Sequence, residues 1–255
     1  MEPLLEKIVE NTEPKSSLQL VVSSNKPRFK TRFNPPIQLD KSRKYEMALV
    51  NLETYYSFPN IDATNNYFRY SPDGGATWVE MHLPEGCYSV NDVNDTIQQK
   101  MMQNGYYDPI NEDYYIEIST NTNTLKSVLS LDNHYQVDFR QPNSISSVLG
   151  FNNNIYTESQ ESENVVDILR INSLLVNIDM ISGSYFNGAS QNTIYSFFPN
   201  VPPGYKIIES PVNLVYLPIT LDTIHSLETS LTDQNGRQLN LRGENISMRF
   251  HIRQI

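Results

Sequence analysis

Side chains that could carry acid–base, nucleophilic or metal chemistry are sparse and isolated in this sequence. The four histidines lie apart from one another and from the single cysteine, Cys87. None belongs to an HExxH zinc motif, and no GxSxG sequence marks a hydrolase nucleophile. We therefore predict no catalytic residue, no metal ligand set and no cofactor, and we interpret the histidines as ordinary strand residues. They are His82, His134, His225 and His251.

Two acidic segments each have a chemical and a structural interpretation. Residues 233–244 begin with Asp-Gln-Asn-Gly and end with Glu244, in weak resemblance to a calcium-binding loop. The glycine comes too early for such a loop, and Arg237 occupies a ligand position, so a β-hairpin turn is favoured. Asp92 and Asp95 fall in the first turn of a predicted helix, where carboxylates interact favourably with the helix dipole. A glycosidase carboxylate pair stays an open alternative, because the separation of carboxylates depends on the fold.

The charge balance restricts the classes of partner. The 255 residues include 19 Lys plus Arg and 29 Asp plus Glu, which gives a formal net charge of −10. An acidic chain repels phosphate unless its charges are segregated. No glycine-rich phosphate loop of the GxxxxGK or GxGxxG type is present. We therefore expect at most non-specific contact with nucleic acid.

Basic residues are nevertheless concentrated in one segment. Lys26, Arg28, Lys30 and Arg32 occupy alternate positions, so a strand would place all four on one face. Seven of the 19 basic residues fall between 26 and 44. We favour an edge strand that its charges protect from unwanted pairing. The alternative is a docking face, for which an acidic protein is the preferred partner.

Two further sets of residues are candidates for an interface. Tyr106 and Tyr107 form one of three tyrosine pairs, and tyrosine is enriched at interfaces because it combines a large apolar body with a polar tip. Such a pair can also simply straddle the two faces of a strand. Residues 1–16 form a predicted N-terminal arm, which either docks on a neighbour or frays. One helical face of this arm carries Leu4, Leu5, Ile8 and Val9.

The elements that must position these residues are mostly strands. From residue 17 onward, apolar and polar residues alternate with a period of two, as in Leu18, Leu20 and Val22. One helix is expected over about residues 90–104, with Ser89 as its N-cap. Pro-Asp-Gly-Gly at 72–75 predicts a hairpin, and residues 152–166 are expected to form an exposed acidic loop. A second hairpin is expected near the C-terminus, where the turn at 233–236 leads to a return strand.

These patterns predict an all-β fold of antiparallel strands, arranged as a sandwich or barrel, in a single domain over residues 17–255. The acidic N-terminus does not resemble a signal peptide, and no apolar run is long enough for a transmembrane helix. A single cysteine excludes an internal disulfide framework and indicates folding in a reducing setting. We therefore expect synthesis in the cytoplasm or nucleus, without secretion.

Several longer segments resemble the minor capsid, or penton, proteins of Polinton/Maverick elements and adintoviruses. These segments are LPEGCYSVNDVNDTIQQKM (83–101), SVLGF (147–151), PNVPPGYKIIESPVNLVYLPI (199–219) and LTDQNGRQLNLRGENISMRFHIR (231–253). The resemblance covers about residues 17–253. It implies a single jelly roll of eight strands in two sheets, with loop insertions. It also implies a homopentamer at the vertices of an icosahedral virion, beside a double-jelly-roll major capsid protein.

Two other classes of function stay open at this point. A jelly-roll module that binds a carbohydrate or a receptor could use exposed tyrosines, Trp78 and asparagines to stack on sugars and to hydrogen-bond them. An enzyme on a β-sandwich is the third hypothesis, and the sequence selects no residue for it.

Overall fold

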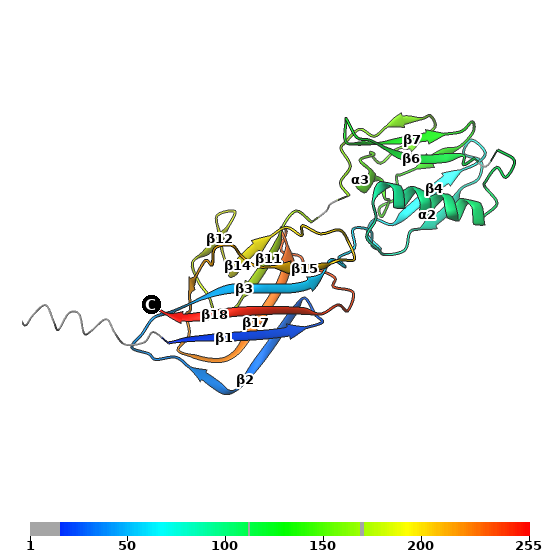
Figure 1. Ribbon diagram of the computed structural model, residues 1–255. Coiled ribbons are helices and arrows are strands. Elements are labelled where there is room, and N and C mark those ends of the chain that lie inside the picture. Colours follow the sequence, from blue (N-terminus) through cyan, green and yellow to red (C-terminus); the bar gives the residue numbers. More distant parts are fainter. Residues whose placement is uncertain (1–15, 112, 169–170) are drawn as a thin grey trace, which may run out of the picture. The chain divides into compact units, whose positions relative to one another are not determined.

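The computed structural model describes residues 16–111, 113–168 and 171–255, and the chain divides into two compact units (Figure 1). The first unit combines the chain up to Ser57 with Ile171–Ile255, and the second is Phe58–Arg170. We call them the jelly-roll unit and the insertion unit. The sequence had suggested one domain over residues 17–255, whereas the structure has a second compact unit within that range. The proposed arm lies outside the described residues except for Ser16.

The jelly-roll unit is built mainly from two antiparallel sheets. The strand order is β1-β18-β3-β15 in one sheet and β14-β11-β17-β2 in the other, so the chain passes repeatedly between the sheets. This is the order of a jelly roll, and it confirms the predicted fold class. The eight strands, as the described residues define them, are β1 (Ser17–Ser24), β2 (Arg28–Gln38), β3 (Tyr45–Tyr55), β11 (Leu174–Ile178), β14 (Thr193–Phe197), β15 (Lys206–Glu209), β17 (Thr223–Asp233) and β18 (Ile246–Gln254).

The core of this unit follows from the period-two pattern of its strands. Side chains that alternate along a strand point to opposite faces of the sheet, so one set can be buried between the two sheets. In β18 the buried set is Ile246, Met248, Phe250 and Ile252. Three minor strands complete the unit: β12 (Ser184–Phe186), β13 (Ala189–Gln191) and β16 (Leu217–Pro218).

The predicted C-terminal hairpin forms its turn, but the return strand that should follow does not develop into a ladder with β17. A turn does form after β17, where the Asp233 carboxylate accepts hydrogen bonds from the backbone N–H groups of Asn235 and Arg237. The chain then returns antiparallel for a few residues, with a bridge between Thr232 and Gln238 and a backbone hydrogen bond from Leu239 N–H to the carbonyl of Leu231 at 3.4 Å. β18 pairs with β1 and β3 in the opposite sheet, so the connection crosses from one sheet to the other.

β2 continues through Pro35 and Pro36, two residues that usually interrupt a strand. β2 forms the end of its sheet and pairs with β17 alone among the described strands. Proline lacks the N–H group that a ladder needs, and an edge strand tolerates that loss on its outer side. The register between β2 and β17 shifts near these prolines, between Ile224 and Ser226.

The insertion unit has its own hydrophobic core, to which buried residues from Ile61 to Tyr156 contribute. Phe68, Tyr70 and Phe139 are among its largest fully buried side chains. Two small sheets surround this core, with orders β5-β4-β8-β9 and β10-β7-β6. Their strands are β4 (Tyr67–Ser71), β5 (Val79–His82), β6 (Ile116–Asn121), β7 (Lys126–Leu131), β8 (Gln136–Asp138), β9 (Ile155–Tyr156) and β10 (Gln160–Glu161).

The helix α2 (Val90–Gln103) confirms the sequence prediction almost residue for residue. Ser89 and Asp92 form a reciprocal capping box, and Gly105 adopts a positive φ just after the helix ends. The buried face of the helix consists of Val90, Val93, Ile97 and Met101, the apolar positions at helical spacing. A second, one-turn helix, α3 (Ser146–Leu149), ends at Gly150, as its sequence indicates.

The hairpin predicted from Pro-Asp-Gly-Gly is also confirmed, since β4 and β5 pair in antiparallel register on either side of it. The segment 152–166 is more ordered than the acidic loop that the sequence suggested. It contains β9 and β10, and the Tyr156 hydroxyl donates to the Glu163 carboxylate at 2.9 Å. Glu158 and Glu161 are exposed, as expected.

Candidate assembly surface

The two sheets of the jelly-roll unit each end in strands whose outer edges are unpaired within the described chain. β15 and β14 end the sheets on one flank, and β1 and β2 end them on the other. Exposed edges and exposed apolar residues are the usual sites of association between protein chains. The two flanks are therefore the candidate surfaces for association with another chain.

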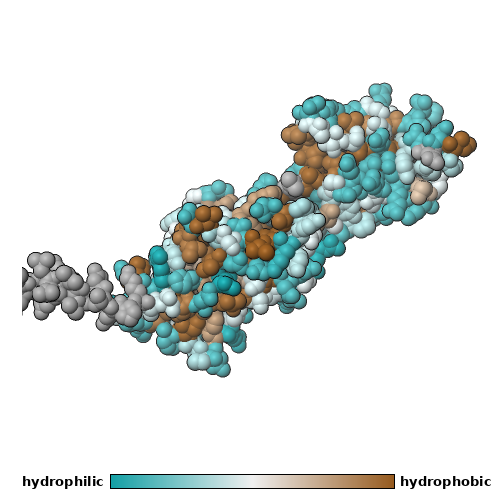
Figure 2. Space-filling model, in the orientation of Figure 1, coloured by the Kyte–Doolittle hydropathy of each residue, from teal (hydrophilic) through white to brown (hydrophobic). Residues whose placement is uncertain are grey.

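The flank at β15 exposes several large apolar side chains along the segment 205–215, which we call the β15 patch. Most large apolar side chains of this unit are buried, which makes this exposure informative. Figure 2 shows hydrophobic residues gathered on the visible face of the jelly-roll unit. The patch consists of Tyr205, Ile208, Val212, Leu214 and Val215.

The strand geometry explains why Ile208 is exposed. Ile207 is 1% exposed and points into the core, so its neighbour Ile208 points outward and is 60% exposed. Lys206 also points outward, and its Nζ lies 2.6 Å from Glu53 Oε2 on β3. This ion pair is exposed, so it contributes little to stability. Ile208 lies opposite Glu53 in the register, so its surroundings include a carboxylate whose charge Lys206 neutralises.

The loop after β15 is fixed at its far end by aromatic and charged contacts. The Tyr216 hydroxyl lies 2.7 Å from His251 Nδ1, and the Arg253 guanidinium lies 3.5 Å from the centre of the Tyr216 ring. A cation above an aromatic face is attracted by the ring quadrupole. Between this anchor and β15, Val212 is 97% exposed. The chain then enters the short strand β16, which pairs with β3 at Met47 and Glu46.

A hydrogen bond between the two sheets closes the β14–β15 flank. The Tyr195 hydroxyl on β14 donates to Glu209 Oε1 on β15 at 2.7 Å. Burial, together with this hydrogen bond to a carboxylate, raises the pKa of Tyr195 to about 12. The neutral phenol therefore holds the edges of the two sheets together over the whole physiological pH range.

This contact predicts a pH dependence that a Tyr195→Phe variant should lack. The pKa of Tyr195 is raised in the folded state, so its contribution to stability is fully present below pH 10 and is lost as the pH rises through about 12. We expect the wild type to be more stable than the variant at pH 8, and the difference to narrow above pH 10. Denaturant titrations of both proteins from pH 8 to 12 measure this. A constant difference over that range would contradict the prediction.

The basic residues that the sequence singled out lie on the opposite flank. Arg28, Lys30 and Arg32 lie on β2, with Lys26 just before it, and all four side chains are exposed. The intervening residues are partly buried, so the predicted alternation of faces is confirmed. β2 is an edge strand, in agreement with the favoured interpretation. Arg28 Nε donates to Glu228 Oε1 on β17 at 2.6 Å, and Lys30 lies opposite Glu228 in the register.

The predicted tyrosine site lies in the insertion unit, and both of its members make contacts within the chain. The ring of Tyr106 packs edge-on against Tyr70 at 5.6 Å, and Tyr107 contacts Tyr114 at 4.8 Å. Both residues are half-buried, so Tyr106 and Tyr107 stay only predicted interface residues. The arm residues Leu4, Leu5, Ile8 and Val9 lie outside the described residues.

Of the residues whose side chains could carry chemistry, His82, His251 and Asp233 make contacts within the chain. His82 packs against the Tyr67 ring, and His251 contacts Tyr216. The Asp233 carboxylate accepts a hydrogen bond from Arg237 Nε at 2.8 Å. This contact agrees with the interpretation as a turn rather than a calcium-binding loop. Among the described residues, no group of three or more His, Cys, Asp or Glu side chains could hold a metal ion. No helix in the described part of the chain is long and apolar enough to cross a membrane.

The net charge is unevenly divided between the two units. Residues 58–170 contain 16 acidic and 5 basic residues, a formal charge of −11. Residues 1–57 and 171–255 contain 13 acidic and 14 basic residues, a formal charge of +1. The acidity of the chain is thus a property of the insertion unit. The jelly-roll unit, which contains the basic strand β2, is nearly neutral, so copies of this unit do not strongly repel one another.

Together these features define a jelly-roll protein with an inserted second unit and an apolar patch at one flank. The fold is similar to the crystal structure of the mavirus penton protein, with a TM-score of 0.50 and 12% sequence identity over 94% of this chain and 100% of that chain. The FliD D2–D3 domains of the flagellar cap from Escherichia coli give a TM-score of 0.15 at 12% identity, which is too low to indicate a shared fold. No protein-family model matches the sequence. No curated protein matches it either.

Proposed function

We propose that this chain is a penton-type minor capsid protein that forms homopentamers at the vertices of an icosahedral virion. The observation that supports this most directly is the similarity of fold to the mavirus penton protein, which spans nearly the whole of both chains. The sequence resemblance to penton proteins of Polinton/Maverick elements and adintoviruses agrees with this assignment. A structural role also suits His82, His251 and Asp233, which make local contacts within the chain.

A ring of identical subunits needs two different surfaces that fit each other. A head-to-tail contact joins one surface of a subunit to the other surface of the next. The subunits close into a ring when a whole number of the rotations that relate neighbours makes up a full turn. The jelly-roll unit has two flanks at opposite ends of its sheets. We place the β15 patch on one side of the contact and the β1–β2 flank of the next subunit on the other. Val21 on β1 is exposed and would supply an apolar partner on that flank.

Energetically, the β15 patch would provide most of the affinity and the charges of β2 would fix the register. Burial of an exposed Ile or Val side chain contributes about 1.5–3 kcal/mol, whereas charged groups at the rim of an interface affect mainly specificity and association rate. Lys30 and Arg32 are the exposed charges best placed for that role. A stable contact of this kind buries roughly 800 Å² per partner, which requires loops as well as the two strands.

The size of the purified protein tests this proposal. Mass photometry or sedimentation should show a pentamer, either directly or after moderate salt screens the repulsion between acidic insertion units. Negative-stain images should show rings with five lobes. A monomer over the whole range of salt and micromolar concentrations would refute the proposal, and a trimer would favour a receptor-binding head.

Two partners beyond the ring belong to the same proposal. We infer that residues 1–16 act as an arm that contacts a neighbouring subunit, and that the vertex abuts a double-jelly-roll major capsid protein. Removal of residues 1–16 should then leave the melting temperature of the jelly-roll unit unchanged while weakening assembly beyond the pentamer. A large drop in melting temperature would instead show that these residues belong to the core.

A further inference from the structure

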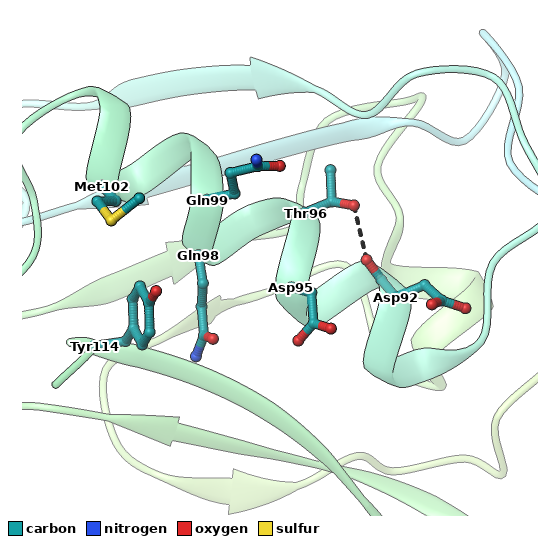
Figure 3. A pocket seen from close by; sticks show the side chains of 7 residues that line it. All are labelled: Asp92, Asp95, Thr96, Gln98, Gln99, Met102 and Tyr114. Atoms are coloured by element: carbon teal, nitrogen blue, oxygen red, sulfur yellow. Dashed lines mark hydrogen bonds between the residues drawn. The ribbon is translucent and has the colours of Figure 1, made fainter. Parts of the chain in front are cut away.

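The insertion unit contains a groove whose walls come from α2 and from the segment that leads into β6. Its volume is about 470 Å³, within the range of small-ligand sites. Figure 3 shows Tyr114, Gln98 and Asp95 on the same side of α2, with Met102 close to Tyr114. The penton proposal assigns no role to this groove.

The groove is held in shape by hydrogen bonds from α2 to the edge of β6. Asn94 Oδ1 accepts the backbone N–H of Ile118 at 2.8 Å, and Gln98 Nε2 donates to the carbonyl of Ile116 at 3.2 Å. These two side chains lie one helical turn apart and meet alternate residues of the strand. The helix therefore covers the free edge of β6, and the amide of Gln98 is fixed in orientation. A fixed polar group binds a ligand without first losing rotamer entropy.

The aromatic side of the groove is also supported. The ring of Tyr114 lies 4.8 Å from that of Tyr107, centre to centre. Tyr114 is half-buried, so one part of its surface is packed and another part lines the groove. Met102 beside it is 47% exposed, and its thioether offers an adaptable apolar contact.

This combination of groups matches the chemistry of a sugar. A pyranose has an apolar face of C–H groups, which can stack on the Tyr114 ring, and a rim of hydroxyls that both donate and accept hydrogen bonds. The Asp95 carboxylate accepts from hydroxyl donors, and a hydrogen bond to an ionised group is stronger than a neutral one. Among the described residues, no Lys or Arg lines the groove, and the insertion unit has a formal charge of −11. Sialic acid and sulfated sugars would therefore be repelled.

We propose that the groove formed by Asp95, Gln98, Met102 and Tyr114 binds a neutral sugar of a glycan. The jelly-roll unit would then build the ring while the insertion unit recognises a neutral glycan, so that the two functions lie in separate parts of one chain. This inference does not depend on assembly, because a monomer presents the same groove.

The experiment is a glycan array probed with the full-length protein, followed by titration calorimetry with the free oligosaccharide that gives the strongest signal. We expect saturable binding to neutral glycans and none to their sialylated or sulfated forms. Asp95→Ala and Tyr114→Ala should each weaken binding at least 10-fold. Tyr114→Phe should retain affinity close to the wild type, because the stacking surface is kept.

The matched control is Glu158→Ala, which removes an exposed carboxylate of the same unit outside the groove. Its affinity should equal that of the wild type, and circular dichroism should show that all variants fold. Three results would each overturn the proposal: no saturable binding to any neutral glycan, binding restricted to anionic glycans, or binding that Asp95→Ala and the tyrosine variants leave unchanged. Neutral-glycan binding by a protein that stays monomeric over the whole range of salt and concentration would support the groove proposal and refute the ring.

Discussion

Replacement of Ile208 by aspartate is expected to convert the proposed pentamer into folded monomers. Ile208 is 60% exposed in the isolated chain, so the substitution removes few contacts of the core. In the proposed ring the same side chain is buried against the next subunit. An aspartate there loses the apolar burial of isoleucine and carries an unpaired charge into the interface, which together cost about 2–4 kcal/mol per contact. Each contact would weaken at least about 30-fold, and a ring has one such contact per subunit.

Mass photometry of the variant beside the wild type measures this effect, and the melting temperature shows that the fold is intact. The control is Ile110→Asp, which introduces the same charge at an 89% exposed isoleucine of the insertion unit. That variant should remain a pentamer. If Ile208→Asp also remains a pentamer while Ile110→Asp dissociates, the ring contact lies on the insertion unit and the β15 patch has another partner.

Truncation of one buried phenylalanine in each unit is expected to destabilise that unit alone. Phe139 is fully buried in the insertion unit, where its ring lies within 6 Å of those of Phe68, Phe151 and Tyr156. Phe250 is fully buried in the jelly-roll unit, in the middle of β18. Removal of a buried phenylalanine ring costs about 3–5 kcal/mol, because it loses apolar burial and leaves a cavity. Each Phe→Ala change should therefore lower one unfolding transition and leave the other in place.

Scanning calorimetry of the two variants distinguishes two units from one. The expected result is that Phe139→Ala lowers only the transition of the insertion unit, because the core cluster around Phe139 draws all its residues from that unit. Pentamer formation should survive Phe139→Ala and fail in Phe250→Ala above the new midpoint. If both variants lower a single common transition, the two units unfold as one cooperative body.

Local features of the fold could be predicted because short-range physics determines them. The helix at 90–103 follows from a capping serine, four apolar residues at helical spacing and a glycine after the end, all within one segment. The hairpin of β4 and β5 follows from the turn preferences of Pro72-Asp73-Gly74-Gly75. The exposed basic face of β2 follows from strict alternation. In each case the residues that decide the structure are neighbours in the chain.

The sequence by itself thus determined an all-β chain, its main helix and the charged edge of β2, and its resemblance to penton proteins suggested the jelly roll. Only the tertiary structure showed that the chain divides at Ser57. The sequence contains no signal of this boundary, because no linker composition marks it and Tyr56 and Phe58 on either side of it are both buried. The tertiary structure also placed β17 and β18 in different sheets and left Val212, Leu214 and Val215 uncovered. Strand pairing and burial depend on residues far apart in the sequence. A period-two pattern predicts which side chains of a strand share a face, but it does not predict which strand lies beside it.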